Sequence, residues 1–157
     1  MTLIDAPAYD PRRDNLIRNL IIAAVVLVIG GFLLGFAGFA MGHGWWFSNL
    51  GAEHKVNSFF NDLQKKDYSA AYNVYTNNHP DPDYPLKRFT EDWTTYSPVK
   101  APITSHHVDV SRVDGDGSFG TNIIVGVTVN GSQRLFLNVQ RSDGTLTCCS
   151  ATHIIQY

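Results

Sequence analysis

An apolar run from Leu20 to Met41 dominates the hydrophobic pattern of the chain, and it contains no charged residue. Its 22 residues would form a helix about 33 Å long, enough to cross a hydrocarbon core of about 30 Å. We therefore expect a membrane-spanning helix over residues 19–42. A cytoplasmic tail over residues 1–18 would precede it, and an interfacial linker over residues 43–51 would join it to one folded head over residues 52–157.

The two flanks of this run differ in charge. Arg12, Arg13 and Arg18 lie close to its start, whereas no lysine or arginine lies close to its end. Because basic residues stay on the cytoplasmic side, we expect a single-pass protein of the cytoplasmic membrane. Its amino terminus would lie inside and its head outside, in the periplasm if the chain is bacterial. Trp45 and Trp46 would form the outer interfacial belt, where amphipathic rings prefer to lie.

A cleaved export signal is the alternative to a retained anchor. Arg12 and Arg13 before an apolar run resemble a twin-arginine signal, and Gly38, Phe39 and Ala40 could serve as a small-residue cleavage site. However, the apolar core of a signal peptide is typically about 7–15 residues long, which is shorter than this run. The length therefore favours a retained anchor.

Glycines recur at four-residue spacing within the run, at Gly31 and Gly35 and again at Gly38 and Gly42. The two pairs share approximately one helix face. Small residues at this spacing let helix backbones approach closely, so this face would pack against a helix of another membrane protein or of a second copy of the chain. The alternative is that glycine is simply frequent in membrane helices.

Beyond residue 52 the pattern becomes that of amphipathic helices in a water-soluble domain. The first helix is predicted by apolar residues at helical spacing: Val56, Phe59, Phe60 and Leu63. A second helix is expected over residues 67–75, and the three prolines of residues 79–85 predict a loop. A third helix is expected over residues 86–96, with Phe89 and Trp93 on one face.

The rest of the chain alternates between apolar and polar residues, as strands do. Four strands are expected, separated by turn signals at residues 114–117, 130–131 and 142–144. In the first strand, His106, Val108 and Val110 would share the core face. Helices followed by an antiparallel meander predict an α+β fold.

The hairpin between the second and third strands can be predicted in more detail. An odd-length loop over residues 129–131, which places Thr128 opposite Ser132, brings two apolar stripes onto one face, as one buried face requires. Gly131 would supply the left-handed residue of this turn. The predicted core stripes are Ile123, Val125, Val127, Leu135, Leu137 and Val139.

The order of these elements resembles the NTF2-like superfamily, which has the cystatin-like fold. The residues that carry the resemblance are Asp67, Tyr68, Ala71 and Tyr72 in the second helix and Phe89 and Trp93 in the third. Within the superfamily, the chain looks like membrane-anchored, lumazine-binding-like bacterial domains. The resemblance implies three helices packed on a curved four-stranded sheet. It does not select a function, because the superfamily includes isomerases, dehydratases, ligand-binding proteins and assembly modules.

If the head binds a ligand, the pocket between helices and sheet is the expected place. The residues that would line it are Tyr72, Tyr75, Phe89, Trp93 and His107. Asp109 is a further candidate acid or base, but on an alternating strand it would face water if His106 and Val108 face the core. No spacing predicts a paired acid and base, so we assign no catalytic residue and expect no enzyme.

Three other motifs invite a chemical interpretation. His79, Asp81 and Asp83 share one loop, but no fourth ligand lies nearby, so we expect a solvated loop and no metal site. The segment 114–117 resembles the start of a calcium loop but lacks the acid at position 12, so a tight turn is expected. Cys148 and Cys149 are adjacent and cannot link distant segments; we expect small buried residues, with a redox switch as the alternative.

Charge and composition narrow the functional classes. The net charge is −2 with acids and bases intermixed, which is not the clustered basic face of a nucleic-acid-binding protein. No cofactor motif is present. We therefore expect a membrane-anchored binding or assembly module that presents its head on the outer side. An accessory subunit of a larger membrane complex and a small pocket enzyme of the isomerase or dehydratase type are the alternatives.

Overall fold

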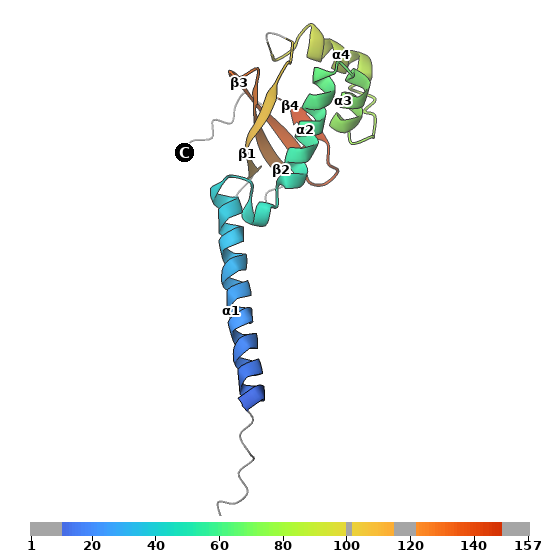
Figure 1. Ribbon diagram of the computed structural model, residues 1–157. Coiled ribbons are helices and arrows are strands. Elements are labelled where there is room, and N and C mark those ends of the chain that lie inside the picture. The colour runs from blue at the N-terminus through green and yellow to red at the C-terminus, as the bar shows by residue number, and fades with distance from the viewer. Residues whose placement is uncertain (1–10, 100–101, 115–121, 149–157) are drawn as a thin grey trace, which may run out of the picture.

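The computed structural model describes residues 11–99, 102–114 and 122–148. A long helix, α1 (Pro11–Ala40), extends away from the head and is joined to it by a tight turn that contains a short 3-10 helix, η2 (Trp45–Phe47) (Figure 1). The head then begins with three helices, which lie on one side of a sheet: α2 (Leu50–Gln64), α3 (Tyr68–Tyr75) and α4 (Leu86–Thr94). Asp67 caps α3, since its side chain accepts a hydrogen bond from the Ala70 N–H at 3.0 Å.

The described residues of the head form a four-stranded antiparallel sheet in the order β1-β2-β3-β4. The strands are β1 (His106–Asp114), β2 (Asn122–Val129), β3 (Gln133–Gln140) and β4 (Leu146–Cys148). The predicted α+β class with an antiparallel four-stranded sheet is confirmed. Because each strand pairs with its neighbour in sequence, β1 lies at one edge of the sheet.

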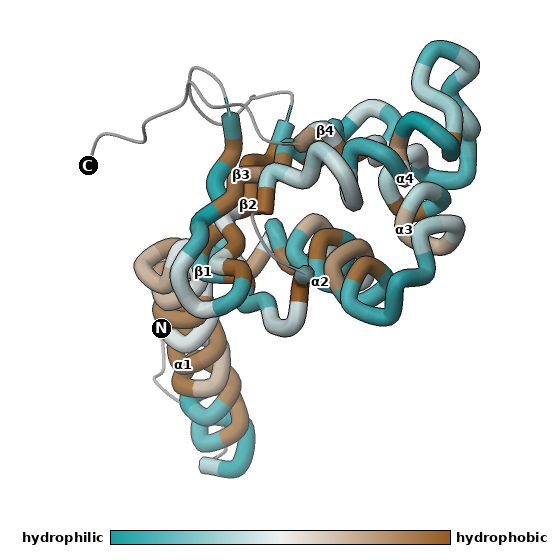
Figure 2. The backbone as a smooth tube through the Cα atoms, turned by 90° about the horizontal axis from the view of Figure 1, so that it is seen from above, coloured by the Kyte–Doolittle hydropathy of each residue, from teal (hydrophilic) through white to brown (hydrophobic). Residues whose placement is uncertain are grey.

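The helix α1 starts earlier than the predicted span, at Pro11 rather than at residue 19. Proline suits the first turn of a helix, where its missing N–H has no partner to lose. Arg12, Arg13 and Arg18 therefore all lie on α1 and are exposed. The helix is long and apolar enough to cross a membrane, properties that a membrane anchor and a signal sequence share. Figure 2 shows its polar start and its apolar remainder.

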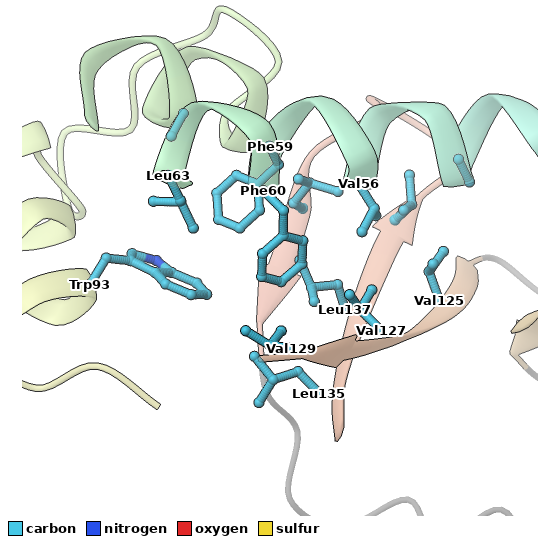
Figure 3. Close-up of a cluster of buried hydrophobic side chains, with 14 of the residues drawn as sticks. Val56, Phe59, Phe60, Leu63, Trp93, Val125, Val127, Val129, Leu135 and Leu137 are labelled. Atoms are coloured by element: carbon cyan, nitrogen blue, oxygen red, sulfur yellow. The ribbon is translucent and has the colours of Figure 1, made fainter. Parts of the chain in front are cut away.

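The core lies between the helices and one face of the sheet (Figure 3). From α2, Val56, Phe59 and Phe60 are fully buried. The sheet contributes the alternate residues that the sequence predicted, and all six are buried: Ile123, Val125, Val127, Leu135, Leu137 and Val139. The apolar side chains that recur every 3.6 residues in α2 and every second residue in β2 and β3 thus face one apolar interior.

The β2–β3 hairpin has the predicted odd-length loop, but its register differs from the prediction. Val129 pairs with Gln133, so the loop comprises residues 130–132, and Thr128 pairs with Arg134 instead of Ser132. The error is two residues, which leaves every side chain on its predicted face.

Asn130 explains why this three-residue loop lies one position further along the chain than predicted. Both Asn130 (φ 51°) and Gly131 (φ 71°) have positive φ, whereas the prediction assigned this conformation to Gly131 alone. The Asn130 side-chain oxygen accepts hydrogen bonds from the backbone N–H groups of Thr104 at 2.8 Å and Ser105 at 3.3 Å. The turn is therefore tied to the segment that leads into β1.

A bulge divides β1 and changes which residues face the core. Val108 pairs directly across from β2, but the register shifts between Val108 and Val110. The predicted core face of His106, Val108 and Val110 is therefore correct for the first two and wrong for Val110. The extra residue is Asp109, and beyond it Ser111 takes the core-side position, as bulges re-aim the side chains that follow.

His106 should make the stability of the head depend on pH. Its ring stacks on Phe60 with 5.4 Å between centroids, and its Nε2 lies 3.1 Å from Asn57 Oδ1. Burial, and to a smaller extent the charge of His107, lower the pKa of His106. The unfolded chain therefore takes up this proton first, so stability is present above the ordinary pKa of about 6.5 and is lost as the pH falls below it.

Denaturant unfolding in detergent at about pH 7.5 and about pH 5.5 measures this effect. The loss of stability on acidification should be smaller in His106→Asn than in wild type. His107→Asn, which changes an exposed histidine on the same strand, should remain close to wild type. Equal pH dependence in His106→Asn and wild type would contradict the assignment.

Candidate functional site

The structure does not bring the five predicted pocket residues to one pocket. Tyr72 and Phe89 are buried in the core, with 5.5 Å between ring centroids. Trp93 lines a cavity of about 350 Å³ and Tyr75 lines a different one of about 380 Å³. His107 is exposed on the face of β1 opposite the core. Aromatic rings thus occupy the space between α2, α3 and α4 in which the ligand was expected.

The cavity beside Tyr75 contains the most polar set of candidate groups. It is lined by Tyr75, His79, Asp81 and Tyr84, among others. Burial raises the pKa of Tyr75. Burial, followed by the hydrogen bond to Asp92 at 2.9 Å, also raises the pKa of Tyr84. Both hydroxyls stay protonated at neutral pH, so neither tyrosine can serve there as a general base.

The other predicted motifs lie apart from each other. His79, Asp81 and Asp83 are exposed in the loop between α3 and α4. Among the residues that the structure describes, no three His, Cys, Asp or Glu side chains gather closely enough to hold a metal ion. Cys148 is half-buried at the end of β4 and is disulfide-bonded. The segment 115–117 and Cys149 lie outside the described residues.

The turn between α1 and α2 forms a second, unpredicted polar site, which we call the joint: Gly42, His43, Asn49, Glu53 and Ser111. The Ser111 N–H donates to the Gly42 carbonyl at 2.8 Å, and Asn49 Nδ2 donates to the Ser111 carbonyl at 3.3 Å. Because β1 is an edge strand, these bonds satisfy backbone groups that would otherwise face outward. The end of the anchor segment is therefore bonded directly to the sheet.

Glu53 is the centre of the joint. Its Oε1 accepts a hydrogen bond from Ser111 Oγ at 2.5 Å and lies 2.8 Å from His43 Nδ1. Asn49, Glu53 and Ser111 are 0%, 6% and 1% exposed. A buried carboxylate is costly unless it has such partners, so the three segments that supply them are held in one arrangement.

The joint contains a serine, a histidine and a carboxylate, but their order does not suit nucleophilic catalysis. In a catalytic triad the histidine lies between the serine and the acid and takes the serine proton. Here Ser111 and His43 both contact the same oxygen of Glu53. Ser111 therefore has no base that could take its proton in the manner of a triad. The arrangement is suited to holding segments together.

The joint is hard to predict from the sequence, because its members are far apart in the chain. Glu53 and Ser111 are 58 positions apart, and each is unremarkable within its own segment. Gly42 was assigned to a helix face, and the bulge at Asp109 turned Ser111 inward. The one usable signal was Asn49 before an amphipathic helix, which is typical of a helix start.

The residues after Gly42 fold back along α1 rather than leading away from it. The Trp45 ring packs edge-on against Phe32 at 5.9 Å between centroids. A Cβ at Gly31 or Gly35 would lie within 3 Å of the Trp46 ring. Most of the predicted interfacial linker, residues 43–49, therefore forms a packed turn, and α2 begins at Leu50. The helix face assigned to a partner at these two glycines is covered by the chain's own Trp46.

The Trp46 contact gives a direct test of the role of the glycines. In Gly35→Leu the new side chain would start 2.6 Å from Trp46 Nε1, so we expect the indole to be displaced from α1. Quenching of Trp46 by acrylamide, isolated by subtracting the matching Trp46→Phe spectrum, should increase. Gly30→Leu is the control, because a Cβ there meets nothing within 4 Å. Equal quenching in the two variants would contradict the packing.

Comparisons of the chain with models of protein families, with curated proteins and with solved structures find no match. The NTF2-like resemblance therefore stays a prediction that rests on the motif residues.

Proposed function

We propose that the chain is a single-pass, membrane-anchored binding or assembly module that presents its α+β head on the outer side of the cytoplasmic membrane. The observation that carries the proposal is the joint. A head that only had to be tethered would need no more than a flexible linker. Here the connection contains buried, hydrogen-bonded side chains from three segments, so the head is held in one orientation on its anchor.

The flanks of α1 support the proposed orientation. Arg12, Arg13 and Arg18 lie at the amino-terminal end of the helix, as expected for a cytoplasmic end. At the other end, Trp45 and Trp46 lie beside the helix and remain 44% and 55% exposed. Exposed indole rings at the end of an apolar helix suit the outer interface of a bilayer.

A reporter enzyme that is active only outside the cytoplasm tests the topology when it is fused after Tyr157. We expect activity from the full chain, together with retention of the protein in membranes after alkaline carbonate extraction. Cytoplasmic activity would contradict the orientation, and release by carbonate would contradict the anchor. A shortened product without α1 in the soluble fraction would favour the export-signal alternative.

The accessory-subunit alternative loses part of its expected contact surface. In that alternative, a helix of the partner would pack on the glycine face of α1. However, Trp46 covers Gly31 and Gly35. A Cβ at Gly38 would lie 2.7 Å from the Gly44 carbonyl oxygen. A partner helix on this face would have to displace the turn. The same glycines are better explained as the space that lets the turn pack on α1, which is what a fixed head requires.

A further inference from the structure

A cavity of about 440 Å³ lies on the side of the joint next to the anchor. Its volume is within the range of small-molecule sites, about 300–1,000 Å³. It combines two kinds of wall. Phe39 and Trp45 supply apolar surface, and Arg112 and Arg141 supply basic side chains. A site with an apolar wall and a cationic wall fits a ligand that is itself apolar at one end and anionic at the other.

The position of this cavity along α1 places it at the level of lipid head groups. Phe39 belongs to the last turn of α1 and faces Trp45, with 6.5 Å between ring centroids. Tryptophan rings prefer the head-group region of a bilayer. Toward the membrane, the helix surface continues as exposed apolar residues such as Phe32 and Phe36. An acyl chain could therefore run from the cavity into the bilayer without crossing polar surface.

The charge of the lining selects an anionic head group. The described residues that line the cavity include Arg112 and Arg141 but no aspartate or glutamate. Glu53 lies behind the wall and already has two partners, His43 and Ser111. Asp114, two residues after Arg112 on β1, lines a separate cavity of about 150 Å³. Both arginines are exposed, and a guanidinium group carries a permanent positive charge that can pair with a phosphodiester.

We propose that this cavity binds an anionic phospholipid of the outer leaflet. Arg112 and Arg141 would bind its phosphodiester, and the first part of an acyl chain would lie on Phe39 and Trp45. The proposal rests on the proposed membrane anchoring of the chain. It extends that function, because a bound lipid would fill the space between the anchor and the sheet and fix the head at one height above the bilayer.

The test uses the full chain in detergent and native mass spectrometry, with dioleoyl phosphatidylglycerol and dioleoyl phosphatidylcholine as probes. Wild type should retain phosphatidylglycerol in preference to phosphatidylcholine. Replacing both arginines, Arg112→Gln with Arg141→Gln, should weaken phosphatidylglycerol binding by about 10-fold to 30-fold, as expected for two basic residues near a membrane surface. Lysine at both positions keeps the charges and should retain most of the binding.

The matched control is Arg88→Gln with Arg134→Gln, which removes the same charge from the head outside the cavity lining and should bind like wild type. Phe39→Ala should also weaken binding, because it removes the apolar wall. Three results would overturn the proposal: equal retention of the two lipids, unchanged binding in the Arg112 and Arg141 double variant, or full competition by millimolar inorganic phosphate with no effect of Phe39→Ala. The last result would identify a simple anion site.

Failure of this proposal is separable from failure of the proposed function. Carbonate extraction and the reporter fusion test the anchor without added lipid. A chain that stays in the membrane with its head outside, yet shows no preference for phosphatidylglycerol, would retain the proposed function and lose only the lipid site. A chain that is released by carbonate would lose both.

Discussion

Replacing Trp93 with alanine is expected to lower the free energy of unfolding of the head by about 3–5 kcal/mol, the usual cost of removing a large buried aromatic side chain. Trp93 is 7% exposed and packs edge-on against Phe59, with 5.1 Å between ring centroids. Its ring centroid also lies 6.3 Å from that of Phe60 and 6.2 Å from that of Phe89. Because small domains are stable by only about 5–15 kcal/mol, the loss is a large share of the total.

Denaturant unfolding of the full chain in detergent, followed by far-ultraviolet circular dichroism, measures this loss. Tyr96→Ala is the matched control, because Tyr96 lies just beyond α4 and is 73% exposed. It should unfold at nearly the wild-type midpoint. If Trp93→Ala also unfolds at the wild-type midpoint, Trp93 does not join α4 to the core as the structure indicates.

Glu53→Ala should weaken the joint by about 2–3 kcal/mol, the range for hydrogen bonds to a charged group in a buried site. Removing the carboxylate leaves the buried Ser111 hydroxyl with only its longer hydrogen bond, to the Gly42 carbonyl at 3.4 Å. The His43 side chain is 27% exposed, so water can compensate for part of its loss, and the cost stays below that of breaking a fully buried ion pair.

Hydrogen exchange at the Ser111 amide gives a local measure of the same change. This amide bonds to the Gly42 carbonyl, so its exchange should become faster when the joint opens, while amides in the centre of β2 and β3 change less. Glu53→Gln keeps an oxygen for Ser111 and should have a smaller effect. Glu91→Ala removes an exposed acid of α4 and should have none. Unchanged Ser111 exchange in Glu53→Ala would show that Glu53 does not hold the joint together.

Much of the fold could be predicted because its signals are local. The spacing of Val56, Phe59 and Phe60 marks one face of a helix, and the alternation in β2 and β3 marks one face of a sheet. These patterns are set by backbone geometry and repeat within a few residues. The two-residue register error in the hairpin has a local cause as well. Asn130 adopts a positive φ that the prediction assigned to Gly131 alone.

The site could not be predicted in the same way, because it depends on where distant segments meet. One bulged residue, Asp109, moves the Ser111 side chain to the core face of the sheet. The pattern of apolar residues in β1 does not indicate this change. Similarly, the four-residue spacing of Gly31 and Gly35 indicates a close approach but does not say what approaches. The spacing was interpreted as a helix contact, and the structure shows an indole ring from the same chain.

A stiff connection between anchor and head has a mechanical consequence. A flexible linker would let the head keep its own orientation when the anchor tilts, whereas the bonds of Ser111 to Gly42 and Glu53 make it turn with the helix. On the proposed topology, an apolar stretch that exceeds the local bilayer thickness tilts, and tilts of about 20° are common. The head would then lean by the same angle, so a change in bilayer thickness at α1 would become a displacement at α4.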